Sequence, residues 1–314
     1  MSWQPSASLP ALQQRAKLYQ IVREFFLAQQ VLEVDVPVLS EYATVDPFID
    51  SLKTKVLGRT EYLQTSPEFF LKRLLAAYQH DVYYLGKAFR QGEQGRRHRP
   101  EFTMLEWYRI GWTEQQLIGE VNNLLALFFP EKPCSAFTYR EVFQQHLSID
   151  PHVATAKVLL QCALSELNGE IDEGLMAGDK NTLLDLLFTH CIEPRLPLGV
   201  VAISDYPASQ AALAKVAEDA QGQLVAKRFE IYVDKIELAN GYWELNEGAE
   251  QQARFEQDVD YRQAHNLPVL PYDQSLVEAL SEGNMPDCAG VALGIDRLLM
   301  CWLGTNDMSD VVSF

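Results

Sequence analysis

Hydrophobic and polar positions recur with two different periods along the chain, and each period predicts a type of element. Over 11–30, apolar residues recur at helical spacing, which predicts an amphipathic helix. Over 32–38 they fill every second position, which predicts a strand. Pro37 confines that strand to a sheet edge or an interface, because proline has no N–H to donate. Helical periodicity returns at later stretches, over 113–130, 138–147, 155–167 and 180–190.

Two strand-like runs, over 82–89 and 102–110, flank a polar loop that contains glycine. Such a pair predicts an antiparallel hairpin. Because side chains alternate across a strand, Glu106 and Tyr108 share one face, and Trp107 takes the other. One face of the hairpin therefore offers a carboxylate and a phenol.

The loop of this hairpin is crowded with arginines, namely Arg90, Arg96, Arg97 and Arg99. Guanidinium groups bind phosphate through paired hydrogen bonds, and a nearby carboxylate can hold an amine. The stretch therefore suits a site for a nucleotide plus an amino compound. The alternative is a solvated strand face below a solvated loop, since short motifs give false positives.

The sequence Thr65-Ser66-Pro67-Glu68, followed by an apolar run, predicts the start of a helix. Two interpretations stay open. Ser66 and Glu68 can simply cap the helix, which the pattern alone favours. Alternatively, the helix start presents Glu68 to the ammonium group of a ligand.

A second hairpin is predicted over 228–245, with Asp234 and Lys235 as its two-residue turn. This register places Glu230 diagonally across from Glu237, and diagonal neighbours lie roughly 7–8 Å apart. Two carboxylates so placed suit Mg²⁺, which commonly uses one or two carboxylates plus substrate phosphates.

Farther along the same strand, Asn240, Tyr242 and Glu244 alternate onto a common face that suits a cationic amine. The alternative is an amphipathic hairpin with a solvated face. That alternative would leave Glu230, Glu237 and Glu244 as uncompensated carboxylates on one sheet.

Near the end of the chain, a strand of small residues is predicted to run into a helix that starts with Asp296 and Arg297. Gly290 and Gly294 let a ligand approach the backbone, and Arg297 lies at a helix start, where anions bind.

Composition narrows the class of protein. The chain has 314 residues, of which 47% are hydrophobic and 22% charged, enough for one large domain or two small ones. It has no apolar run of about 18 residues and no signal-like N-terminus, so we expect no membrane span and a cytoplasmic location. Its five scattered cysteines argue against a disulfide framework or a thiolate zinc site. The net charge of −17 makes a tRNA partner unexpected.

In their order along the chain, these segments resemble the three motifs of class II aminoacyl-tRNA synthetases, and within that class the lysyl branch. Residues 11–37 resemble motif 1, the dimer-forming element, 89–108 resemble motif 2 and 290–297 resemble motif 3. Segments similar to lysyl-specific signatures are 65–68, 100–106 and 237–241. The resemblance implies an α+β fold over 1–314, mainly an antiparallel sheet flanked by helices, with 131–200 as a mostly helical insertion, and a homodimer.

Because the motif 1 helix starts almost at Met1, we expect no N-terminal anticodon-binding barrel. The chain then resembles the truncated paralogues of lysyl-tRNA synthetase, the elongation factor P–(R)-β-lysine ligases. That family uses ATP to activate (R)-β-lysine and transfers it to a lysine ε-amine of elongation factor P.

The resemblance implies a role for each matching residue. Arg90 would hold the amino-acid carboxylate and the α-phosphate while the adenylate forms, and Arg297 would clamp the γ-phosphate. Glu237, with Glu230, would carry Mg²⁺. The substrate pocket would be lined by Ser66, Glu68, Glu106, Tyr108, Asn240, Tyr242, Glu244 and Ala292. The ATP site would comprise Arg90, Gln91, Gly92, Glu93, Arg99, Phe102, Glu237, Leu238, Gly294 and Arg297.

Three positions depart from the lysyl pattern. Ala292 replaces a glycine, and its methyl group would discriminate α- from β-lysine by about 1–3 kcal/mol. Motif 2 normally reads Arg-x-Glu, but here Gly92 takes the third position and the carboxylate follows at Glu93. Arg99 replaces an asparagine that contacts ATP. Either Glu93 substitutes after a small loop shift, or adenine binding is weaker.

Two other functions stay open. One is a truncated ligase on the same scaffold that charges tRNA or uses ammonia. The other is a catalytically dead paralogue that serves as a binding or regulatory subunit, which Gly92 and Arg99 favour and the intact Arg90 and Arg297 oppose.

Overall fold

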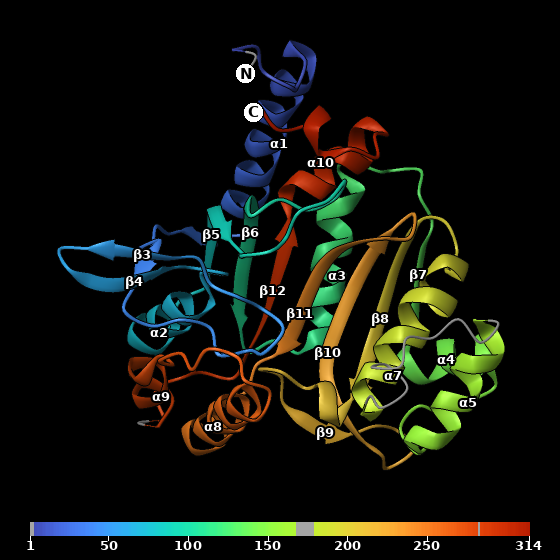
Figure 1. Ribbon diagram of the computed structural model, residues 1–314. Helices are drawn as coiled ribbons and strands as arrows, with labels where there is room; N and C mark the ends of the chain where they lie inside the picture. The colour runs from blue at the N-terminus through green and yellow to red at the C-terminus, as the bar shows by residue number, and fades with distance from the viewer. Residues whose placement is uncertain (1–2, 168–178, 282) are drawn as a thin grey trace. The chain divides into compact units, whose positions relative to one another are not determined.

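The computed structural model describes residues 3–167, 179–281 and 283–314 (Figure 1). The chain divides into two compact units. The first combines Met1–Pro130 with Glu244–Phe314, and the second is Glu131–Trp243. The prediction of a single domain over 1–314 stays a prediction.

The sheet of the first unit contains β1 (Leu32–Glu33), β5 (Val82–Phe89), β6 (Glu101–Ile110) and β12 (Cys288–Gly294), in that order. Strands β5 and β6 form the predicted antiparallel hairpin, and β12 pairs antiparallel with the other edge of β6. Strand β1 is parallel to β5. The long ladder of β6 therefore holds motif 2 and motif 3 side by side.

The prediction of one strand over 32–38 is wrong, because the observed strand is much shorter. Only β1 pairs with β5, and the last ladder bond runs from Val34 N to Tyr83 O at 2.9 Å. The next strand, β2 (Leu39–Ser40), belongs to a separate sheet, in the order β2, β4 (Arg59–Leu63), β3 (Lys53–Val56). Pro37 lies in the gap, where a residue without N–H cannot extend the ladder. The predicted edge position of β1 is confirmed.

Two helices pack on the Trp107 face of β6. The ring of Phe26, on α1 (Leu9–Ala28), lies 5.2 Å from the Trp107 ring, centroid to centroid. Trp107 Nε1 donates to Glu120 of α3 (Glu114–Ala126) at 2.8 Å. Both predicted helices are confirmed. Glu106 and Tyr108 lie on the opposite face of β6, which these two helices do not cover and which carries the candidate site.

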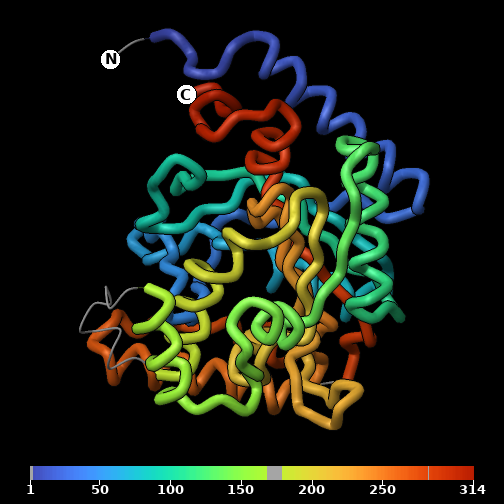
Figure 2. Tube along the Cα trace, turned by 90° about the vertical axis from the view of Figure 1, so that its right-hand side faces the viewer, coloured from blue at the N-terminus to red at the C-terminus, as the bar shows by residue number. Residues whose placement is uncertain are grey.

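The first helix also contacts the last. In Figures 1 and 2, α1 (blue) lies beside α10 (Ile295–Leu303, red). Arg15 of α1 forms an ion pair with the buried Asp296 and donates to Val311 O at 2.9 Å. The other oxygen of Asp296 accepts the N–H of Thr103 at 2.7 Å. Asp296 thus fixes the start of α10 to β6 and α1.

The remaining helices of this unit are α2 (Glu68–Tyr78), α8 (Gly248–Ala264) and α9 (Gln274–Ser281), which pack as one group, and a 3₁₀ turn at Met308–Asp310. Arg262 of α8 is fully buried. It donates to Asp46 O and to Asp50 Oδ1, each at 2.8 Å. These bonds tie α8 to the loop that precedes β3.

The second unit has its own sheet. Its strands are β7 (Cys134–Thr138), β8 (Val200–Pro207), β10 (Leu224–Val233) and β11 (Ile236–Trp243), in that order, and β9 (Val216–Glu218) also pairs with β10. All pairings are antiparallel except β7 with β8. Asp234 and Lys235 form the predicted turn with φ of 47° and 70°, as a type I′ turn requires.

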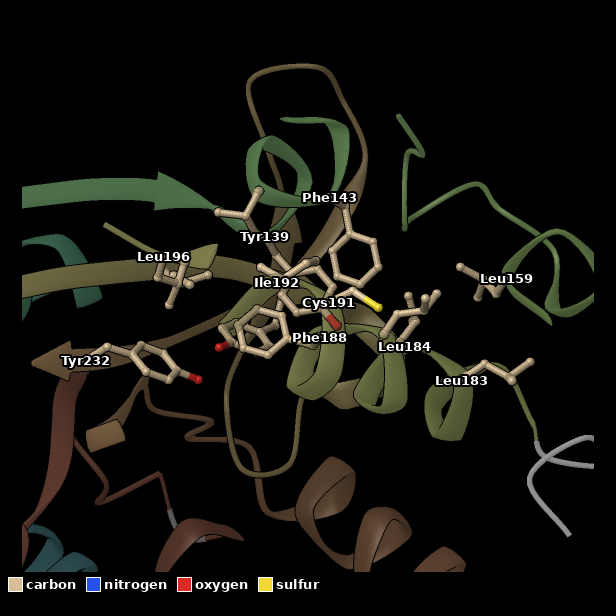
Figure 3. Close-up of a cluster of buried hydrophobic side chains, with 14 of the residues drawn as sticks. Tyr139, Phe143, Leu159, Leu183, Leu184, Phe188, Cys191, Ile192, Leu196 and Tyr232 are labelled. Atoms are coloured by element: carbon tan, nitrogen blue, oxygen red, sulfur yellow. The ribbon is translucent and has the colours of Figure 1, made fainter. Parts of the chain in front are cut away.

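Among the described residues of the second unit, three helices match the predictions, namely α4 (Tyr139–Leu147), α5 (Ala156–Glu166) and α7 (Lys180–Leu187). Helix α7 continues as a π-helix at Phe188–Ile192 and a 3₁₀ turn at Glu193–Arg195. A separate 3₁₀ turn at Ala208–Gln210 follows β8. Figure 3 shows the aromatic rings that join the helices to the sheet, with Cys191 among them. The rings of Tyr139 and Phe188 stack at 5.3 Å. The second unit therefore has a hydrophobic core of its own.

The fold is α+β, a mixed and mostly antiparallel arrangement of strands flanked by helices, as predicted. Within the described ranges, none of the helices has the length and apolar character needed to cross a membrane.

Candidate active site

A buried carboxylate forms the centre of the site. Glu106, in the middle of β6, is 2% exposed. Ser66 Oγ donates to Glu106 Oε2 at 2.6 Å, and the Tyr108 hydroxyl donates to Oε1 at 2.7 Å. Ser66 Oγ also accepts the N–H of Glu68 at 3.0 Å. Ser66 therefore satisfies the start of α2, as the capping interpretation predicted, and also contacts Glu106. The presentation of Glu68 to a ligand ammonium stays a prediction.

Three carboxylates gather here, and we call Glu68, Glu106 and Glu244 the carboxylate cluster. Lys72, one turn after Glu68 on α2, is 1% exposed and places its Nζ 2.6 Å from Glu68 Oε1. The same Nζ lies 2.6 Å from Glu244 Oε2. Glu244 is held in turn by its backbone N–H, which donates to Cys288 O of β12 at 2.9 Å.

Burial dominates the protonation of the cluster. It raises the pKa of Glu106 to about 8, together with the charge of Glu68 and against the hydrogen bonds from Ser66 and Tyr108. Burial also raises the pKa of Glu244 to about 8, against the opposing charge of Lys72. Burial alone would lower the pKa of Lys72, but Glu244 and Glu68 outweigh it and raise that pKa. The Lys72 ammonium therefore stays charged, while the carboxyls of Glu106 and Glu244 hold protons near neutral pH.

Small residues of β12 make room beside the cluster. Gly290 pairs with Tyr108, Ala292 with Glu106 and Gly294 with Met104. A Cβ at Gly290 would lie 2.3 Å from Tyr108 Cε1 and 2.4 Å from Glu244 Oε1, so only glycine fits there. At Gly294 the nearest side-chain atom would be 3.8 Å away, on Arg297. The methyl group of Ala292 is thus on the strand position directly across from the central carboxylate.

Arg90 lies where β5 ends. Its guanidinium is 3.5 Å from Glu93 Oε1 and lies over the Phe102 ring, 5.3 Å from the centroid. Gly92 has φ of +84°, which disfavours glutamate at this position of the turn. The carboxylate displaced to Glu93 therefore contacts Arg90. The neighbouring Gln91 is exposed, and its N–H donates to Asp50 O at 2.8 Å.

The arginine loop meets the start of α10. Arg297 NH2 lies 2.5 Å from His98 Nε2. Burial and the charge of Arg297 lower the pKa of His98, so the neutral ring can accept a hydrogen bond from Arg297. Arg99 donates to Phe314 O. A cavity of about 530 Å³ is lined by Arg96, Arg97, His98 and Asn306.

The other predicted site residues lie in the second unit, on β10 and β11. Glu230 is 8% exposed and accepts from Arg228 at 2.6 Å and from the Tyr232 hydroxyl at 2.5 Å. Each Glu230 oxygen therefore already accepts one hydrogen bond, and an Mg²⁺ ion would have to share an oxygen with Arg228 or Tyr232. Glu237 pairs with Tyr232 in the ladder, as predicted, and is partly buried. The predicted diagonal placement of Glu230 is wrong, because a β-bulge between Ile231 and Tyr232 shifts the register and sets Glu230 opposite Asn240. The ligand role of Glu230 and Glu237 stays a prediction.

Asn240 and Tyr242 are partly buried on β11, opposite Glu230 and Arg228, and Leu238 is buried. Within the described part of the chain, the buried Asn240 Oδ1 has no hydrogen-bond partner. An acceptor left in this state is suited to a donor brought by a ligand.

Sequence reasoning missed Lys72. Its neighbours Leu71 and Leu75 are buried on the same helix, so the apolar run hid a charged residue inside it. The signal that could have found it is its spacing, because Glu68 and Lys72 stand at i and i+4 on one helix face. A lysine at a buried position needs a carboxylate partner.

Comparison with known proteins places the chain. The family model described as tRNA synthetases class II (D, K and N) matches residues 4–314. A protein of Salmonella dublin named elongation factor P–(R)-β-lysine ligase is 44% identical over 321 aligned residues, covering 100% of this chain and 97% of the relative. Proteins of the same name from Salmonella paratyphi B and Salmonella heidelberg are 43% identical with the same coverage.

Proposed function

Because the chain belongs to the class II tRNA synthetase family of the D, K and N group, we propose that it uses ATP to activate an amino acid that carries two ammonium groups. The observation that carries this proposal is the carboxylate cluster, in which Glu106 and Glu244 are almost fully buried beside Tyr108. Burial keeps these two carboxyls protonated near neutral pH in the protein alone, and the ammonium groups of a diamino acid would favour their ionised form.

The substrate we propose is (R)-β-lysine, and the acceptor is a lysine ε-amine of elongation factor P. Relatives of that name match the chain over its whole length. Ala292 adds a physical reason, since its methyl group lies opposite Glu106 and narrows the pocket near the amine. In the first step, a carboxylate oxygen of the substrate attacks the α-phosphorus of ATP and pyrophosphate leaves. In the second, the acceptor amine attacks the activated carbonyl, loses a proton and releases AMP.

Positioning and electrostatics supply the catalysis in this proposal. Arg90, which lies over Phe102, would bind the substrate carboxylate and the α-phosphate and stabilise the charge that develops between them. Arg297, in the first turn of α10, would bind the γ-phosphate, which requires it to leave His98. The Asp296 contacts fix the helix that carries Arg297.

Mg²⁺ would neutralise phosphate charge during transfer. Glu237 is the residue we propose to hold it, with Glu230 joining through an oxygen that it shares with Arg228 or Tyr232. We also propose a homodimer formed through the 11–37 segment and a cytoplasmic location. Sedimentation of the full chain tests the first, and fractionation of cells the second.

The test of the function is ATP–pyrophosphate exchange with (R)-β-lysine, α-lysine or no amino acid. We expect strong exchange with (R)-β-lysine and its loss in Arg297→Ala. Arg59→Ala is the matched control, because the Arg59 side chain is 78% exposed and pairs with Glu41 at the surface. Exchange with neither lysine would refute amino-acid activation and favour a binding subunit.

A transfer assay then separates the two ligase functions. Labelled (R)-β-lysine, ATP and the protein are incubated with elongation factor P or with tRNA. Label on elongation factor P supports the proposal, whereas label on tRNA alone would support a truncated synthetase.

A further inference from the structure

We propose that Lys72 is a positioning residue for amine recognition, because its ammonium holds Glu68 and Glu244 in place and sets the charge that the cluster offers to a ligand. The inference rests on the proposed function, since it concerns how the same pocket recognises its substrate.

Lys72 joins two segments that are distant in the sequence. Glu68 begins α2, and Glu244 lies between β11 and α8. The Lys72 Nζ lies 2.6 Å from one oxygen of each. A single ammonium group therefore fixes the separation of the two carboxylates.

The Lys72 end of the carboxylate cluster is shielded from solvent, whereas the Glu68 end is partly exposed to it. The side chains of Lys72 and Glu244 are each 1% exposed, whereas that of Glu68 is 15% exposed. A ligand therefore reaches the cluster past Glu68, and Lys72 lies on the inner side. From there Lys72 can act on the carboxylates without occupying the entrance.

The charges give Lys72 a second effect. Near neutral pH the carboxyls of Glu106 and Glu244 hold protons, so an amine that binds to them has to displace these protons. Burial raises the pKa of Glu244, and the charge of Lys72 opposes that rise. Without Lys72 the Glu244 carboxyl would keep its proton to higher pH, and the amine would have to displace it over a wider pH range.

This effect separates a positioning role from a merely structural one. A residue that only stabilises the fold would, when lost, alter the KM for the amine and the KM for ATP together. Loss of the Lys72 charge would raise the pKa of a carboxyl that the amine must find ionised, so it would alter the KM for the amine alone and extend the dependence of that KM on pH to higher pH.

The experiment measures ATP–pyrophosphate exchange of the full chain with (R)-β-lysine between about pH 6.5 and 8.5. The proteins are wild type, Lys72→Met, Lys72→Arg and Lys87→Met. The last is the control, because Lys87 pairs with Glu101 on the surface and its side chain is 48% exposed. Thermal unfolding of each variant reports whether it is folded.

For Lys72→Met we expect the KM for the amine at pH 7 to rise by about tenfold or more, with the KM for ATP changed less than about twofold. Near pH 8.5, log KM for the amine should fall with pH more steeply than in the wild type, by up to about one proton, because the Glu244 carboxyl would still be protonated there. Lys72→Arg keeps the charge, so it should raise the KM for the amine but retain the wild-type slope. Lys87→Met should match wild type.

A folded Lys72→Met with wild-type KM and slope would overturn the inference, as would equal increases of both KM values. If Lys72→Met does not fold, Lys72→Arg decides, and an unchanged KM for the amine in that variant would overturn it. Failure of the proposed function gives a different result, because the wild type itself would then show no exchange that depends on the amine.

Discussion

Gly290 lies directly opposite Tyr108 in the ladder of β6 and β12, and the Tyr108 ring fills the space that a β-carbon at residue 290 would need. The same β-carbon would lie 2.4 Å from Glu244 Oε1. The missing side chain at Gly290 thus lets a phenol and a carboxylate approach the same position of β12.

Gly290→Ala should therefore displace Tyr108 and Glu244 together. We expect a loss of about 1–3 kcal/mol in the free energy of unfolding, from overpacking, and a higher KM for the amine. Urea denaturation and exchange kinetics measure the two effects. Gly294→Ala is the matched control for stability, since its β-carbon would lie 3.8 Å from the nearest side-chain atom. Equal destabilisation by both substitutions would contradict the explanation.

The protein without ligand should lose stability as the pH rises towards 8. Burial raises the pKa of Glu106 from 4.5 to about 8, so between these values the folded state binds more protons than the unfolded state. Stability therefore falls with rising pH across this window, and Glu244 acts in the same direction.

We expect a change on the order of 1–3 kcal/mol between pH 5.5 and 8.5, measured as a decrease in the melting temperature. Glu106→Gln should flatten this dependence. A cationic substrate favours the ionised carboxyls, so it should raise the melting temperature more at pH 8.5 than at pH 6.5. A wild-type profile as flat as that of Glu106→Gln would show that Glu106 does not titrate in this range.

Loss of Arg15 should lower the free energy of unfolding more in a protein that keeps Asp296 than in one that carries Asp296→Asn. Asp296 is 2% exposed, and Arg15→Met leaves its carboxylate with the Thr103 N–H but without its cation. We expect about 2–4 kcal/mol of destabilisation in urea. Adding Asp296→Asn removes the unpaired charge and should recover part of that loss. Additive effects of the two substitutions would mean that the residues are not energetically coupled.

Ala292→Gly should shift the amino-acid preference towards α-lysine. The methyl group lies on the residue opposite Glu106, and one methyl group is worth about 1–3 kcal/mol in a pocket. The ratio of kcat/KM for (R)-β-lysine to that for α-lysine should fall by about tenfold or more. Exchange assays with both amino acids measure it, and an unchanged ratio would assign the discrimination to another residue.

Local pattern was enough to predict the regular parts of the fold. The periodicity of 82–89 and 102–110 predicted the β5–β6 hairpin, and the I′ turn at Asp234 and Lys235 fixed the register that places Glu237 opposite Tyr232. Pattern failed over 32–38, where alternation continued through Pro37 although the ladder did not.

Contacts between distant segments could not be predicted in the same way. Nothing local to Lys72 indicates that Glu244 lies 2.6 Å from its Nζ, because the two residues meet only after α2 and the segment before α8 pack together. Glu230 shows the same limit. The sequence places Arg228 two residues before Glu230, but it does not predict that the two side chains form an ion pair.

The order of segments in the chain also determines when each unit can form during synthesis. The second unit is the continuous stretch Glu131–Trp243, whereas the first needs both Met1–Pro130 and Glu244–Phe314. Strand β12 can pair with β6 only after nearly two hundred further residues have been made. Arg15 likewise cannot form its ion pair until Asp296 has been made. At a synthesis rate of about 5–20 residues per second, the second unit would thus be able to fold before the segment that completes the carboxylate cluster has been made. Chains arrested at increasing lengths should show protease protection of 131–243 first, and the carboxylate cluster would be among the last features of the molecule to assemble.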